Sequence, residues 1–133
     1  MKAIDIVVNP YTPQEVEGGQ TGIDAVFQDQ IRMPAEMRGG VTVDDYVEKM
    51  NRADIELSLM IAVRAGDMRL AGSFEISYER VHEICQSHPT RFAGLAGVDP
   101  YRGMQGLRDL ESAVRDYGFV GAHLYPHWFE LAP

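Results

Sequence analysis

The chain has 133 residues, with 12 Lys and Arg against 20 Asp and Glu, so its formal net charge is −8. A chain of this length suits one domain, and a hydrophobic fraction of 45% argues against disorder. The negative charge argues against partners such as nucleic acid or a membrane surface, because anionic surfaces would repel the chain. With a single cysteine, no signal sequence and no apolar run of about 18 residues, the chain is expected to be cytoplasmic.

Four short apolar runs predict β-strands, over residues 4–8, 55–63, 92–98 and 119–125. Three of them end close to a proline, which cannot donate a hydrogen bond to a strand ladder. Runs that are apolar throughout are typical of strands covered on both faces, as in parallel sheets.

Helical patterns separate these strands. Thr42 can cap a helix whose first turn contains Asp44 and Asp45, and two more helices are expected over residues 75–86 and 104–117. Their alternation with the strands predicts a parallel α/β protein. The side chains expected to be buried are Val43, Tyr46, Val47 and Met50 on the first helix, Tyr78, Val81, Ile84 and Cys85 on the second, and Leu107, Leu110, Val114 and Tyr117 on the third.

Two segments do not fit the simple alternation. Residues 10–40 are rich in proline and glycine around one short helix, 23–31, and follow the carboxyl end of the first strand, where α/β proteins bind ligands. A ligand-binding insertion and a flexible loop are both consistent with this segment. After the fourth strand come Trp128, Phe129 and Leu131, with no following helix to cover them. The chain is therefore expected to be part of a larger fold.

Three segments resemble the amidohydrolase-related family, metal-dependent hydrolases and decarboxylases built on a (β/α)8 barrel that include aminocarboxymuconate-semialdehyde decarboxylase. Residues 4–10 (IDIVVNP) are similar to the family's first strand, residues 91–100 (RFAGLAGVDP) to its RF-G-A-VDP strand, and residues 118–126 (GFVGAHLYP) to its GF-G-K-L-H-P strand. Such a barrel needs about 250 residues. The resemblance therefore implies a single domain, residues 1–133, that forms the N-terminal half of a TIM (β/α)8 barrel with about four parallel strands.

The resemblance also implies a divalent metal such as zinc, held by His-x-His on the first strand. Alternate residues of a strand point the same way, so both imidazoles can reach one ion. Here the corresponding positions hold Val7 and Asn9, and only Asp5, which precedes the motif, is kept. We therefore assign no metal ligand, and the identity of any cofactor stays open.

Polar side chains gather near the end of the fourth predicted strand. His123 and Tyr125 alternate there, and His127 follows, at the end of a strand where barrel enzymes place their active groups. Imidazole and phenol groups both donate and accept hydrogen bonds and suit acid–base catalysis, although a strand end satisfied by water is the alternative. We assign candidate catalytic roles to Asp5, His123 and Tyr125, and candidate substrate-binding roles to Asn9 and His127.

The resemblance implies hydrolysis or decarboxylation of a small carboxylate-bearing molecule at the C-terminal face of the barrel. Arg64, Asp67 and Arg69 follow the second strand and can serve either as carboxylate-binding groups or as a surface charge cluster. The alternative function is a catalytically inactive barrel fragment that acts as an association module. A half-barrel leaves two strand edges unpaired, which favours a homo-oligomer or association through those edges.

Overall fold

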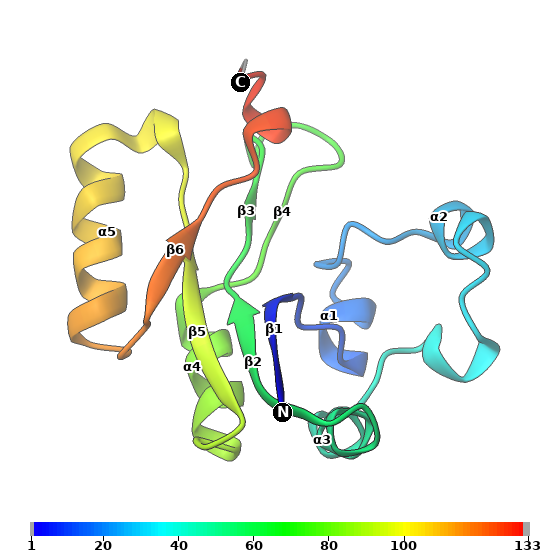
Figure 1. Ribbon diagram of the computed structural model, residues 1–133. Helices are drawn as coiled ribbons and strands as arrows, with labels where there is room; N and C mark the ends of the chain where they lie inside the picture. Colours follow the sequence, from blue (N-terminus) through cyan, green and yellow to red (C-terminus); the bar gives the residue numbers. More distant parts are fainter. Residues whose placement is uncertain (1, 132–133) are drawn as a thin grey trace.

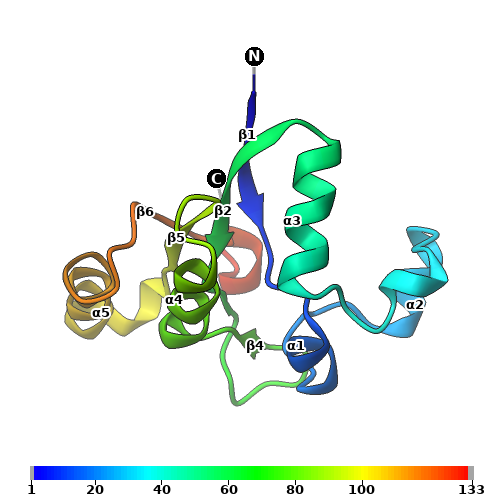
Figure 2. The same cartoon turned by 90° about the horizontal axis from the view of Figure 1, so that it is seen from below.

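The computed structural model describes residues 2–131 and confirms the predicted α/β half-barrel. Its main sheet has four parallel strands in the order β1 (Ala3–Val8), β2 (Ile55–Ile61), β5 (Phe92–Gly97) and β6 (Gly121–His123). The helices α3 (Val43–Arg52), α4 (Tyr78–Ser87) and α5 (Gly103–Arg115) lie on one side of this sheet (Figure 2). The carboxyl ends of the strands all point toward the same end of the molecule (Figure 1).

The first of these helices begins where the sequence predicts, and the first two both bury side chains that were expected to face inward. Thr42 accepts a hydrogen bond from the backbone of Asp45 at 3.1 Å, and Ser77 caps α4 in the same way. On α3, Met50 is 1% exposed. All four residues predicted to face inward from α4 are buried. Both helices pack against β2, and α4 also packs against β5.

Helix α5 is rotated relative to the prediction. Leu107 and Val114 are 59% and 54% exposed, so their predicted burial is wrong. The side that packs on the sheet carries Gly106, Leu110 and the fully buried Ala113. A Cβ atom at Gly106 would lie 3.2 Å from the carbonyl oxygen of Asp99, so small residues bring this helix close to the chain beneath it.

A short antiparallel hairpin follows β2 and was not predicted. It consists of β3 (Arg64–Ala65) and β4 (Phe74–Glu75), and it explains why the second helix begins at Tyr78 rather than at residue 75. Where the chain leaves β2, β5 passes very close to it. A Cβ atom at Gly97 would lie 2.1 Å from the carbonyl oxygen of Ala62, so only glycine fits there.

The segment between β1 and α3 contains α1 (Pro13–Glu17), α2 (Ala25–Gln30) and a 3-10 turn, η1 (Ala35–Met37). Of these, α2 lies away from the sheet (Figure 1). Glu15 of α1 is fully buried and pairs with Arg80 of α4 at 2.6 Å. Helix α1 was not predicted, although Thr12-Pro13-Gln14-Glu15 matches the capping-box pattern that marks a helix start.

The two ends of the described chain differ in how well they are covered. On β1, Ile4, Ile6 and Val7 are 58%, 67% and 52% exposed, so the expectation that every strand is covered on both faces is wrong for β1. After β6, the 3-10 turn η3 (Pro126–Phe129) buries Phe129, contrary to the expectation that it lacks cover. Among residues 2–131, no helix is long and apolar enough to cross a membrane.

Candidate functional site

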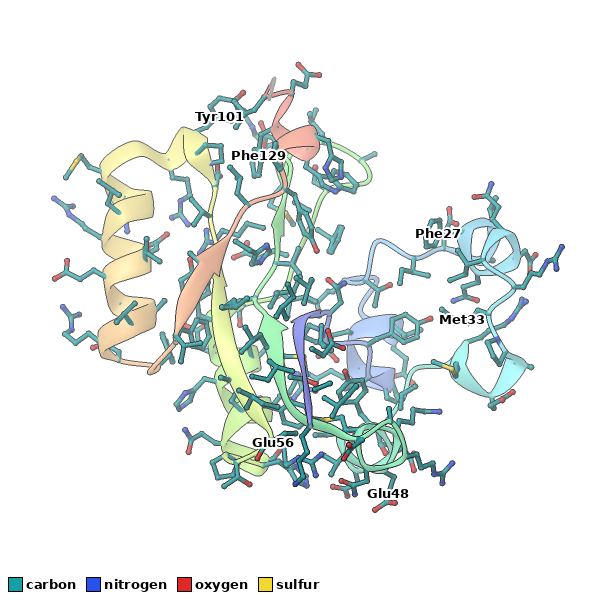
Figure 3. The ribbon with its side chains drawn as sticks, viewed as in Figure 1. Phe27, Met33, Glu48, Glu56, Tyr101 and Phe129 are labelled. Carbon is teal, nitrogen blue, oxygen red and sulfur yellow. The ribbon has the colours of Figure 1, made fainter. Side chains whose placement is uncertain are left out.

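The carboxyl ends of the four parallel strands form the candidate site. In a parallel α/β fold this end collects the loops that bind ligands. Four connections meet there: the chain after β1, the β3–β4 hairpin, the 3-10 turn η2 (Pro100–Arg102) after β5, and η3 after β6. Figure 3 shows Tyr101 of η2 beside Phe129 of η3 at this end, and the Tyr101 hydroxyl donates to the carbonyl oxygen of Phe129 at 2.6 Å.

Four of the five predicted site residues form one cluster at this end. The Tyr125 hydroxyl donates to Oδ1 of Asn9 at 3.2 Å, which connects the last strand of the sheet to the first. The rings of His123 and Tyr125 pack edge to face with their centroids 5.1 Å apart. The ring of His127 lies 5.8 Å from that of Tyr125. The side chains of Asn9, His123, Tyr125 and His127 are called the mouth cluster below.

His123 is held in one orientation by the chain just after β2, which is separated from β6 by β5. Its Nε2 atom lies 2.9 Å from the carbonyl oxygen of Ala62. A carbonyl oxygen can only accept, so Nε2 carries the hydrogen and Nδ1 keeps its lone pair. Burial lowers the pKa of His123 and outweighs the bond to Ala62, which acts in the opposite direction. His123 is therefore a neutral imidazole at pH 7, with Nδ1 able to accept a proton.

Asp5, the fifth predicted site residue, lies apart from the mouth cluster. It is paired in register with Ser58, which is fully buried and lies 3.5 Å from the hydroxyl of Tyr46 on α3. The pKa of Tyr46 is raised, mainly by burial, and the nearby Asp5 carboxylate adds to the effect. Asp5 therefore faces α3. An irregularity between Asp5 and Val8 reverses the alternation of side chains beyond this point.

A pocket of about 670 Å³ lies beside the mouth cluster, within the usual size range of small-molecule sites. Trp128 forms part of its wall, and the Trp128 ring lies 5.9 Å from that of His127 and 5.7 Å from that of Phe74. Trp128 therefore lies between the pocket and the mouth cluster, whose own residues do not line the pocket. Its aromatic wall consists of Tyr101, Trp128 and Phe129, and its charged lining consists of Arg64, Asp67, Arg69, Glu75, Asp99, Arg102 and Glu130.

Most of the charged groups in this pocket are already paired. Arg69 binds Asp67 through Nε at 2.9 Å, and its hydrogen bonds lower the pKa of Asp67 to about 2. Arg64 and Arg102 share the carboxylate of Asp109, at 3.6 and 2.7 Å. The sequence left two roles open for three charged residues, carboxylate binding or a surface charge cluster. In the structure these residues line the pocket and are held in ion pairs: Arg64, Asp67 and Arg69. Among the three arginines that line the pocket, Arg69 is the most accessible, with 87% of its side chain exposed.

The metal site that the family resemblance implies does not fit the residues present. Within residues 2–131, no group of three His, Cys, Asp or Glu side chains could hold an ion. At the two His-x-His positions, Val7 has no donor atom, and the amide oxygen of Asn9 accepts from Tyr125. These residues alone do not supply a divalent-metal site.

Comparison with known proteins supports the fold. No protein-family model and no curated protein matches the sequence. The structure is similar to 4-oxalomesaconate hydratase from Rhodopseudomonas palustris, with 25% identity and a TM-score of 0.58, over 98% of this chain and 44% of that chain. It is also similar to an uncharacterized TIM-barrel protein from Bordetella bronchiseptica, with 16% identity and a TM-score of 0.65, over 95% of this chain and 44% of that chain.

A third similar structure is 5-carboxyvanillate decarboxylase from Novosphingobium aromaticivorans, solved with bound manganese. It shares 17% identity at a TM-score of 0.62, over 92% of this chain and 41% of that chain. This chain thus spans less than half the length of each of the three proteins. The structures confirm the resemblance to amidohydrolase-related proteins: this chain has the fold of the N-terminal half of their barrel.

Proposed function

We propose that the mouth cluster and the adjoining pocket form part of an active site that hydrolyses or decarboxylates a small carboxylate-bearing molecule. The observation that carries this proposal is the oriented, neutral His123. Its Nε2–H is engaged by Ala62, its ring packs on Tyr125, and its Nδ1 keeps a free lone pair at the ends of the strands. The similarity to 5-carboxyvanillate decarboxylase supports the decarboxylation reaction.

The chemistry assigned to His123 is proton transfer. In hydrolysis, Nδ1 accepts a proton from the attacking water and returns it to the leaving group. In decarboxylation, the same atom, once protonated, donates its proton to the carbon that loses carbon dioxide. Asn9 fixes the hydroxyl of Tyr125, whose oxygen keeps acceptor capacity for a substrate hydroxyl. In this proposal Arg69, which lines the adjoining pocket with 87% of its side chain exposed, binds the substrate carboxylate.

The test measures turnover by the purified whole chain with hydroxybenzoates that carry a carboxylate and with small carboxylate-bearing esters, lactones and amides. Removing a general acid–base group costs about 10²- to 10⁴-fold in rate. We expect a loss of that size for His123→Gln and a smaller loss for Tyr125→Phe. The matched control His82→Gln, on α4, should keep the wild-type rate. No turnover by the wild type, or an equal loss in both histidine variants, contradicts the proposal.

The alternative function, an association module, is favoured by a different observation. Three apolar side chains of β1 are more than half exposed. Exposed apolar groups on an edge strand are typical of surfaces that bind another polypeptide. This function does not require the mouth cluster to be catalytic.

A further inference from the structure

Both edges of the four-stranded sheet are unpaired within residues 2–131. β1 pairs only with β2, and β6 pairs only with β5. All four strands are parallel, so the two free edges run in the same direction. A free strand edge presents a row of backbone donors and acceptors that a further strand can pair with.

The sheet also has an apolar face that α3, α4 and α5 do not cover. Ser58 is fully buried beside Tyr46 of α3, so it marks the helix-covered face. Its neighbours Leu57 and Leu59 point to the opposite face, because side chains alternate along a strand. Ile4 is paired with Leu57 and lies on that same face, 58% exposed. The free edge at β1 therefore continues an apolar surface.

We propose that a second copy of this chain covers this surface, related to the first by a two-fold axis parallel to the strands. Such an axis keeps the strand direction, so β6 of each copy lies parallel to β1 of the other. The two sheets together then contain eight parallel strands, the number that closes a (β/α)8 barrel. Both free edges of both copies are paired in one closed assembly.

The charges at the two edges suit this arrangement, although each chain carries a net charge of −8. The only ionised side chain in β1 is that of Asp5, which faces α3 rather than the free edge. In β6 the only titratable residue is His123, which is neutral at pH 7. Pairing of β6 with β1 therefore brings no like charges together.

The assembly also completes the candidate site. In one chain, Asn9 and His127 of the mouth cluster are exposed. A second copy places its own strand ends opposite and encloses the cluster in a barrel mouth. The inference goes beyond the proposed reaction, since association is measured without any substrate.

The first test is light scattering coupled to size exclusion on the whole chain, over a wide concentration range. We expect the wild type to have twice the mass of one chain, and Ile6→Lys and Ile4→Lys each to have the mass of one chain with an unchanged circular dichroism spectrum. Leu107→Lys, an equally exposed apolar position on α5, is the matched control and should stay dimeric. A monomeric or aggregated wild type, dimeric β1 variants or a monomeric Leu107→Lys variant overturns the proposal.

The second test locates the contact with a short thiol cross-linker. Ile4→Cys near the start of β1 and Val120→Cys just before β6 are both exposed and lie at the amino ends of the two edge strands, at opposite edges of one sheet but at neighbouring edges of two copies. Cys85 is buried and its pKa is raised to about 11, so it should not react. We expect a covalent dimer from the double variant and none from either single variant. A covalent dimer from a single variant, or none from the double variant, contradicts the two-fold arrangement.

Discussion

The substitution Arg80→Met tests how the chain after β1 is fixed to the rest of the fold. Glu15 is fully buried, and Arg80 approaches its Oε1 at 2.6 Å while remaining 22% exposed. Glu15 also accepts from the backbone nitrogen of Thr12 at 3.1 Å and from the Thr12 hydroxyl. Thr12 follows closely on Asn9, so this contact ties the start of the candidate site to α4.

Removing one partner of a buried ion pair typically costs about 3–5 kcal/mol, because the other charge stays buried without compensation. Arg80 is partly solvated and Thr12 remains, so we expect a loss of about 3 kcal/mol in the free energy of unfolding at pH 7. The loss should depend on pH. In the wild type, burial raises the pKa of Glu15, but Arg80 and Thr12 together outweigh burial and lower it below 4.5. This contribution to stability is present above the unfolded-state pKa and is lost as the pH falls through the lower folded-state value.

In the Arg80→Met variant burial dominates, so the pKa of Glu15 should rise above its value in the unfolded chain. The folded variant then binds a proton more readily than the unfolded one, and its deficit relative to the wild type should shrink between pH 7 and pH 4. Urea unfolding followed by circular dichroism at several pH values measures this difference. The control Arg115→Met removes a solvent-exposed ion pair with Asp116 and should have little effect. A deficit below about 1 kcal/mol at pH 7, less than even the low end of the range for a buried pair, refutes the reasoning, as does a deficit that does not change with pH.

Two more predictions concern His123 and Gly97. In an NMR titration, His123 should lose its charge at a pH below 6.5, because burial lowers its pKa. The free energy of unfolding should therefore decrease as the pH falls through about 6.5, since the unfolded chain binds the proton more readily. A measured pKa at or above 6.5 contradicts the buried, neutral imidazole. Gly97→Ala should cost about 3 kcal/mol in the free energy of unfolding, measured by urea, because the new methyl group meets the Ala62 carbonyl. Gly39→Ala, where a Cβ atom meets nothing within 4 Å, is its control, and equal stability of the two variants rules out the steric explanation.

The sequence predicted the sheet and its three longer helices because those elements depend on local patterns. Prolines mark strand ends, and Thr42 marks a helix start, whereas the Ser77 cap that sets the start of α4 was not predicted. The exposure of Leu107 and Val114 could not be predicted in the same way. Periodicity shows that a helix has an apolar side, but here the buried position is the small Ala113, and Gly106 packs against the chain just after β5.

The candidate site was predictable to the extent that it follows the strand ends. His123, Tyr125 and His127 are close in sequence, and Asn9 joins them because parallel strands end together. Asp5 was assigned to the site from the family resemblance alone, and the irregularity in β1 beyond Asp5 could not be predicted from the sequence. The pairing of Glu15 with Arg80 joins residues 65 positions apart, and no local pattern connects them.

The hydrogen bond between Tyr125 and Asn9 has a mechanical consequence. It joins the end of the last strand directly to the end of the first, across the concave side of the sheet like a chord across an arc, and the two strands between them take no part in it. Flattening the sheet would lengthen that chord and break the bond. The bond therefore favours a curved sheet, in which the ends of the first and last strands approach each other.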